Sequence, residues 1–113
     1  MQVSIQIPTL DKEGHSLPFH TVDRISCRVR SVMIDFFTRI TSTEGKRFWK
    51  DNTGNVIEEK VEIFSAFVDT NYMKFPTASV HGHMTGLAFE VKIGLDQEEV
   101  FFTVDNAHFN YSG

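Results

Sequence analysis

Residues 77–97 read TASVHGHMTGLAFEVKIGLDQ, and the structure of this stretch decides the fold of the whole chain. As a helix, it would carry an apolar stripe made of Val80, Met84, Leu87, Ala88, Val91 and Leu95. As a strand, residues 87–95 alternate just as well between apolar and other positions. Gly82 and Gly86 each cost a helix about 1 kcal/mol relative to alanine. We nevertheless favour the helix, because a sheet in this chain needs a second helix to cover its exposed face.

The first forty residues predict one strand and one helix. Val3, Ile5 and Ile7 alternate with polar residues, which is typical of a strand with one buried face, and Pro8 ends the pattern. From Val22 to Phe37 the apolar residues advance by three and four positions, which predicts a helix with one buried side.

The middle of the chain predicts a long hairpin. Residues 38–43 are rich in β-branched side chains and predict a strand, bent or interrupted at Glu44-Gly45 before residues 46–50 extend again. The sequence at 51–54, DNTG, fits a type I turn, and a strand follows from 56 to 68. Because the second half of this strand has apolar residues on both faces, we expect that half to be central and covered on both sides.

The end of the chain predicts a closing hairpin, with alternation from Val100 to Val104, a turn at Asp105-Asn106 and a short last strand at 108–111. The order of elements predicts an α+β fold, a ferredoxin-like split βαββαβ sandwich with an extra C-terminal strand. Its two helices should lie on one face of an antiparallel sheet. At 113 residues we expect a single domain, 1–113.

Two motifs carry a resemblance to other proteins. The block from Gly45 to Val68 contains Trp49, the turn at 51–54 and the pair Glu58-Glu59 before an apolar strand. The second motif, residues 94–100 leading into 104–106, places a glutamine after a helix and an aspartate turn after a strand. Together they cover under half the chain and resemble a family of small uncharacterised bacterial proteins with a ferredoxin-like α+β fold. The resemblance implies a helix at 77–97 and implies no substrate.

Composition and charge narrow the classes of function. No apolar stretch approaches the roughly 20 residues of a membrane span, the amino terminus lacks a signal-peptide pattern, and the single Cys27 forms no intramolecular disulfide. We therefore expect a soluble cytoplasmic protein. A net charge of −4 makes nucleic acid an unfavourable partner. Arg24 and Arg28, one turn apart on the predicted helix, are the remaining candidates for binding an anion, and a surface salt-bridge row explains them equally well.

No catalytic or metal-binding motif is present in the sequence. His81 and His83 are two positions apart, so they share a face only on a strand, and no cysteine or carboxylate lies close by to complete a metal shell. We therefore predict no metal and no cofactor. The sequence also lacks a phosphate-binding loop, a nucleophile elbow and an HExxH motif, so catalytic residues stay unassigned.

The expected function follows from the sheet. Two helices cover one face, yet the strands are apolar on both. This predicts a twofold homodimer in which the two sheets, or their edge strands, meet and bury the second face, with Phe67 and Phe102 at the interface. The first interpretation is therefore a non-catalytic interaction or regulatory module that binds a second copy of itself, with another protein as a further candidate partner. The alternative is a small dimeric α+β-barrel-type enzyme or binder of a hydrophobic small molecule, with a His or Asp as acid or base.

Overall fold

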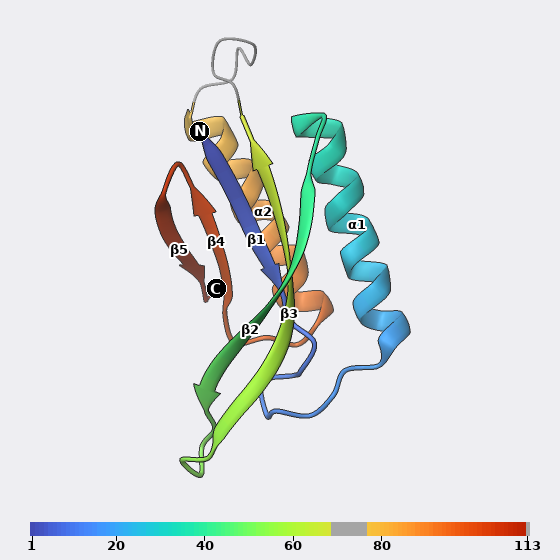
Figure 1. Cartoon of the computed structure of the whole chain (residues 1–113), viewed down its shortest axis with the longest axis vertical. Coiled ribbons are helices and arrows are strands. Elements are labelled where there is room, and N and C mark those ends of the chain that lie inside the picture. The colour runs from blue at the N-terminus through green and yellow to red at the C-terminus, as the bar shows by residue number, and fades with distance from the viewer. Residues whose placement is uncertain (69–76, 113) are drawn as a thin grey trace.

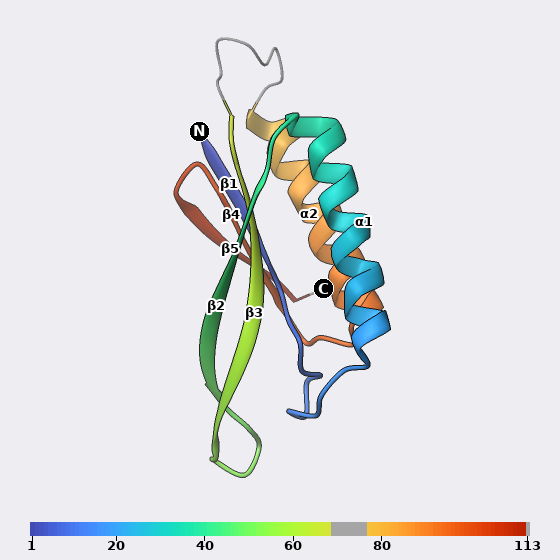
Figure 2. The same ribbon diagram turned by 45° about the vertical axis from the view of Figure 1, so that its right-hand side comes forward.

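The computed structural model describes residues 1–68 and 77–112. Within these residues the elements follow the order β1 (Gln2–Ile7), α1 (Phe19–Phe37), β2 (Thr41–Lys50), β3 (Val56–Phe67), α2 (Thr77–Gly94), β4 (Val100–Val104) and β5 (Ala107–Tyr111). The strands form one sheet in the order β2-β3-β1-β4-β5, and every pairing is antiparallel. Both helices lie against the same face of this sheet (Figures 1 and 2). The predicted ferredoxin-like order with an extra C-terminal strand is confirmed.

The helix predicted at residues 77–97 exists. The residues of its apolar stripe, from Val80 to Leu95, are all buried. At its carboxyl end a side chain at Gly94 would overlap the tip of Ile25, so glycine lets α2 approach α1 closely here. None of the described helices is long and apolar enough to cross a lipid bilayer.

The first helix begins three residues earlier than predicted, directly after Pro18, because a proline at a helix start sacrifices no intrahelical hydrogen bond. It buries Ser26, Val29, Met33 and Phe37 and turns its charged residues outward. At the other end Thr38 has φ 74°, and its N–H donates to the Ile34 carbonyl at 2.8 Å. This local turn uses the residues that were expected to begin the next strand.

The β2–β3 hairpin is continuous, so the predicted interruption at Glu44-Gly45 is wrong. Gly45 pairs with Val61 in an unbroken register, and a Cβ at Gly45 would lie 3.1 Å from Cδ1 of Ile63. The glycine thus makes room for a cross-strand side chain rather than breaking the strand. The predicted turn is confirmed, since the Gly54 N–H donates to the Asp51 carbonyl at 3.1 Å. The far half of the hairpin extends beyond the helices as an arm (Figure 2).

The two faces of the sheet differ in character. The helix-covered face contributes Val3, Ile5, Ile7, Phe64, Ala66, Phe102 and Val104 to one core with the helices. The other face is mostly polar at its centre, where Ser4 and Thr103 share a hydrogen bond of 2.7 Å beside Gln2 and Ser65. Ile63 and Phe101 also lie on this face, and Phe67, 79% exposed, is its most exposed large apolar residue. The apolar residues expected on the second face are there, but β1 and β4 add polar residues such as Ser4 and Thr103 beside them, so the face is mixed and the need to cover it is weaker.

Candidate functional site

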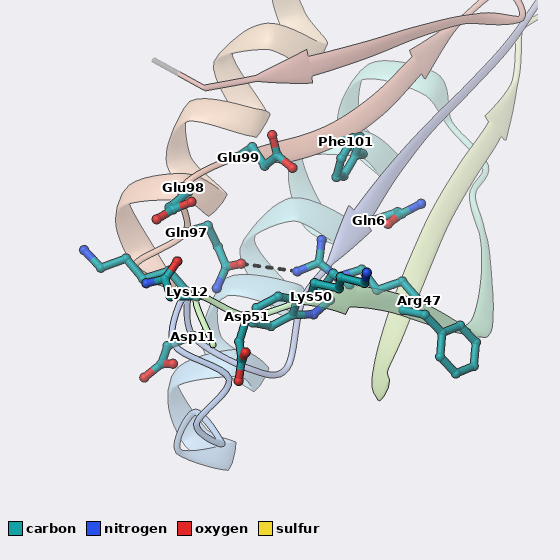
Figure 3. A pocket seen from close by; sticks show the side chains of 13 residues that line it. Gln6, Asp11, Lys12, Arg47, Lys50, Asp51, Gln97, Glu98, Glu99 and Phe101 are labelled. Atoms are coloured by element: carbon teal, nitrogen blue, oxygen red, sulfur yellow. Dashed lines mark hydrogen bonds between the residues drawn. The ribbon is translucent and has the colours of Figure 1, made fainter. Parts of the chain in front are cut away.

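An open pocket lies on the helix-free side of the sheet, near the base of the arm (Figure 3). It has a volume of about 450 Å³. Three segments far apart in sequence meet around it: the loop after β1, the end of β2, and the chain between α2 and β4. Its lining comprises Gln6, Asp11, Lys12, Arg47, Phe48, Trp49, Lys50, Asp51, Asn52, Gln97, Glu98, Glu99 and Phe101. The volume is within the range of small-molecule sites.

A buried carboxylate, Glu59, organises the base of this pocket. Its side chain is fully buried, and Oε2 accepts hydrogen bonds from the backbone N–H groups of Thr9 at 2.9 Å and Leu10 at 2.8 Å. Its other oxygen, Oε1, accepts from the Arg47 guanidinium and from the Trp49 indole, the latter at 3.2 Å. A buried charge is tolerated when it is paired and fully hydrogen-bonded, as here. Glu59 therefore ties the loop after β1 to the arm.

Gln97 continues the same network on the opposite side of Arg47. It is buried, and its amide donates to the carbonyls of Leu10 at 2.7 Å and Leu95 at 2.9 Å. Its Oε1 accepts a long hydrogen bond of 3.5 Å from Arg47, drawn as the dashed line in Figure 3. Arg47 is thus held between a carboxylate and an amide, and its remaining N–H groups are available to a ligand.

The loop between β1 and α1 supports the arm by packing. Gly14 has φ +86°, a conformation that favours glycine, and a Cβ there would lie 3.6 Å from both Trp49 and Ile57. The close contact of this loop with the arm fixes one side of the Trp49 ring. Trp49 is therefore positioned by packing as well as by its hydrogen bond to Glu59.

Two of the four lining carboxylates, Asp11 and Asp51, accept hydrogen bonds from the backbone within turns. The backbone N–H of His15 donates to Asp11 at 2.9 Å and lowers the pKa of that carboxyl below 3.8. The Thr53 hydroxyl donates to Asp51 at 2.7 Å and likewise lowers the pKa of Asp51. Both aspartates are thus ionised at neutral pH and are poor proton acceptors.

The other two carboxylates lie between α2 and β4. Glu99 accepts a hydrogen bond from Asn110, whereas Glu98 has no ion pair within the described part of the chain. Against the four lining carboxylates stand three cations, Lys12, Arg47 and Lys50, so the lining carries a formal charge of −1. Lys12 is also paired with Asp96 at 3.4 Å. This balance favours a neutral, cationic or zwitterionic ligand over an anion.

The residues singled out from the sequence do not meet in one site. Arg28 forms an exposed ion pair with Glu90 at 3.3 Å, and Arg24 is exposed on α1. Phe67 is exposed on the helix-free side of the sheet, outside the pocket lining. Phe102 is 3% exposed, and this placement corrects its predicted role, since the alternation along β4 turns Phe102 to the core and Phe101 to the pocket.

One feature of the sequence indicates the pocket. Arg47 and Trp49 share a strand face, and the register places Arg47 directly opposite Glu59. An acidic residue in a strand that is otherwise buried indicates a paired charge. The third contributor, Gln97, is distant in sequence, and only the fold brings it beside Arg47.

The histidines lie outside the pocket lining. His83 stacks on Phe36, with ring centroids 4.0 Å apart, and His81 packs edge-on against Phe109 at 4.5 Å. Burial lowers the pKa of His83 below 6.5, and the nearby Glu90 opposes this shift. Within residues 1–68 and 77–112, no group of three or more His, Cys, Asp or Glu side chains is arranged to hold a metal ion.

Comparison with protein-family models and with curated proteins finds no match for this sequence. Two solved structures share its fold. One is a phage SAM lyase in the apo state, 12% identical, and the other is a phage SAM lyase in complex with S-methyl-5'-thioadenosine, 9% identical. Each has a TM-score of 0.68 and matches 99% of this chain and 88% of the other. At this identity the similarity demonstrates a common fold.

Proposed function

We propose that the chain is a small-molecule enzyme whose site is the pocket beside Arg47, Trp49 and Phe101. The observation that carries this proposal is the Glu59–Arg47–Gln97 network, in which two buried polar residues hold a partly exposed arginine at the edge of an open cavity. Preorganised polar groups in a concave site are typical of ligand-binding centres. A protein that served only as a structural module would gain little from holding a charge pair in this arrangement, because buried pairs are weak contributors to stability.

The lining indicates the chemical class of the ligand. Trp49 and the 36%-exposed Phe101 offer ring surfaces on which a flat heterocycle can stack. Glu98 offers a carboxylate with no partner among the described residues, suited to a positive charge on the ligand. Arg47 offers spare N–H donors for a carboxylate or hydroxyl group. A compact zwitterion that contains a heterocycle matches all three features.

The fold comparison supports the same class. Both similar structures are of a phage SAM lyase, one of them in complex with S-methyl-5'-thioadenosine. SAM is a nucleoside with a sulfonium cation and an amino-acid group, and we propose that this chain binds SAM or a related nucleoside thioether. This choice favours the enzyme alternative over the interaction module that the sequence first indicated.

The proposed acid–base roles differ from those expected from the sequence. A histidine was one candidate, but the described lining residues include none. Aspartate was the other, and both lining aspartates cap turns with a lowered pKa. Glu98 is therefore the carboxylate that we propose faces the reacting part of the ligand.

Isothermal titration with S-methyl-5'-thioadenosine and with SAM tests the binding proposal. The wild type should bind at least one of them, and Phe101→Ala should weaken binding about 10-fold or more, because stacking of a base on an aromatic ring contributes about 1–3 kcal/mol. Phe67→Ala is the matched control, since it removes an exposed ring from the same side of the sheet but outside the pocket lining. It should bind as the wild type does.

Incubation with SAM tests the catalytic part of the proposal. Breaking the bond between the SAM sulfur and its amino-acid side chain sends the electron pair to sulfur, while the side chain's own carboxylate or water bonds to the freed carbon. Chromatography should therefore show S-methyl-5'-thioadenosine and an equal amount of the amino-acid fragment accumulating with the wild type and, more slowly, with Glu98→Gln. Binding without turnover would leave a small-molecule binding protein and refute the enzyme. Absence of binding for both compounds would refute the proposed site and restore the interaction module as the leading interpretation.

A further inference from the structure

The helix α2 lacks the polar outer surface that a helix on the outside of a sheet usually has. Glu90 and Lys92 are the charged residues among its 18 positions, and both lie at the flanks of its outer side. The neighbouring helix α1 instead exposes several charged residues, including Asp23, Arg24, Arg30 and Asp35. A helix that is apolar all round is normally covered on all sides.

The outer strip of α2 consists of Gly82, Gly86, Phe89 and Ile93. These positions are spaced by four, three and four residues, so they follow one line along the helix. Phe89 is 50% exposed and Ile93 is 65% exposed. At both glycines, the space where a Cβ would lie has no atom within 4 Å. The strip therefore combines two protruding side chains with two open hollows.

The protrusions and hollows are spaced so that the strip complements itself. Consider two copies of α2 packed antiparallel about a twofold axis that passes midway between residues 87 and 88. Ile93 lies as far beyond this axis as Gly82 lies before it, and Phe89 and Gly86 are related in the same way. Each large side chain of one helix then faces a glycine of the other, which permits close approach of the two backbones.

From this complementarity we infer that the chain forms a homodimer through α2, with Ile93 and Phe89 of each copy seated against Gly82 and Gly86 of the other. A twofold interface of this kind is isologous, so one self-complementary strip is sufficient. The pocket is on the helix-free side of the sheet, so this interface is independent of the proposed function. The sheet-face homodimer expected from the sequence is replaced by a helix-face homodimer.

Charge favours a second copy over other occupants of the strip. The chain carries a net charge of −4, and the uncharged strip is a place where two copies can meet without juxtaposing carboxylates. A membrane surface would require a polar helix face rich in Lys and Arg, but α2 has a single Lys92.

Area sets the expected strength of this dimer. The exposed parts of Phe89 and Ile93 amount to on the order of 200 Å² per copy, well below the roughly 800 Å² per partner of a standard stable interface. Tyr111 of β5 extends the apolar surface, because its ring packs edge-on against Phe89 with centroids 6.1 Å apart. The dimer should therefore be reversible, with a dissociation constant on the order of 100 µM.

Sedimentation equilibrium over a concentration series from about 10 µM to about 1 mM, spanning the expected dissociation constant, tests the dimer. The wild type should pass from monomer to dimer across this range. Ile93→Glu should abolish the dimer, whereas Ile34→Glu is the matched control, because Ile34 is an exposed isoleucine on α1 and is 42% accessible. A wild type that stays monomeric throughout, or an Ile34→Glu variant that loses the dimer while Ile93→Glu keeps it, overturns the inference.

Gly86→Leu distinguishes specific packing of Phe89 against Gly86 from non-specific apolar association. The substitution adds apolar surface and replaces glycine by a better helix former, so the monomer should fold at least as well as the wild type. If Phe89 of the partner occupies the hollow at Gly86, the added side chain blocks it, and dimerisation should weaken at least 10-fold. Stronger association of Gly86→Leu would show non-specific apolar contact and contradict the inference.

A charge pair tests the register of the two helices. Ile93→Glu combined with Gly82→Lys in one chain places opposite charges where the two copies meet, so dimerisation should recover relative to Ile93→Glu alone. The combination of Ile93→Glu with Ser79→Lys is the control, because residue 79 is also exposed on α2 but does not face residue 93 of the partner in this register. Equal recovery by both combinations would overturn the proposed register.

Discussion

At the scale of single residues, Glu59 has the strongest structural role. It is a fully buried carboxylate with four hydrogen-bond donors from two segments: two backbone N–H groups of the loop after β1, and the Arg47 and Trp49 side chains of β2. Removing one partner of a buried ion pair leaves the other charge uncompensated, which costs more than the intact pair contributes. The identity of this one side chain therefore determines whether the base of the pocket keeps its shape.

Glu59→Gln should lower the free energy of unfolding by about 2–3 kcal/mol, because it removes the charge opposite Arg47 and gives the Trp49 N–H a weaker acceptor. Urea denaturation followed by circular dichroism measures the change. Glu58→Gln is the control in the adjacent position, since its ion pair with Lys46 is more than half exposed on both sides and should contribute less than about 1 kcal/mol. Equal losses for the two variants would show that loss of Glu59 leaves no uncompensated buried charge on Arg47.

His83 provides a prediction about pH. Burial lowers its folded-state pKa below 6.5, and its Nε2 has no hydrogen-bond partner in the described structure. Below pH 6.5 the unfolded chain takes up a proton that the folded chain resists, so this group makes stability fall as pH drops from 6.5 towards the folded pKa. Above pH 6.5 it should have no effect.

Proton NMR of the His83 ring should give a midpoint below 6.5. His83→Phe keeps a ring against Phe36 without a titrating group, so its loss of stability between pH 7 and pH 5 should be smaller than that of the wild type. His15→Phe is the control, because His15 is a largely exposed histidine. A midpoint at or above 6.5 would contradict the assigned effect of burial.

At the scale of elements, the glycines of α2 explain why its sequence fits two templates. Gly82 and Gly86 lower the helix propensity of the segment, yet the stripe from Val80 to Leu95 packs on the sheet and α1. Burial of this stripe outweighs a local cost of about 1 kcal/mol per glycine. Tertiary packing thus decides a choice that local preference leaves open.

Gly82→Ala should raise the free energy of unfolding by about 0.5–1 kcal/mol, because the position is an exposed helix interior with open space around the missing Cβ. Gly54→Ala should have the opposite sign. It is equally open, but its φ of +86° is unfavourable for alanine by about 1–2 kcal/mol. Thermal unfolding of dilute monomer compares them, and a loss of stability in Gly82→Ala would mean that the outer side of α2 is already covered in the monomer.

Much of the architecture was predictable because periodic burial leaves a clear pattern. The alternation of Val3, Ile5 and Ile7 and the turn at residues 51–54 are local signals, and both appear in the structure as predicted. Gly45 was misread because a glycine in a strand can mark either a break or a close cross-strand contact. Sequence alone does not show the side chain of Ile63 across from it.

At the scale of the whole molecule, the site was less predictable than the fold. Arg47 comes from β2, Gln97 from the connection between α2 and β4, and Phe101 from β4, and their proximity depends on sheet order and on the loop after β1. The error about the second sheet face has a similar origin. The apolar residues of β3 do not represent the whole face, because the neighbouring β1 and β4 contribute Ser4 and Thr103 there. Whether a sheet face is polar or apolar depends on the residues that all of its strands contribute.

The central claim, that the pocket beside Arg47 binds a nucleoside thioether or sulfonium, has a direct reporter. Trp49 is the only tryptophan of the chain and lines the pocket, so its fluorescence reports on this site alone. Titration with SAM and, separately, with S-methyl-5'-thioadenosine should produce, for at least one of them, a saturable change in Trp49 emission that Phe101→Ala shifts to about 10-fold higher concentration and Phe67→Ala leaves in place. An emission spectrum that stays unchanged up to millimolar concentrations of both compounds, or a change that survives Phe101→Ala with the same midpoint, would contradict the account.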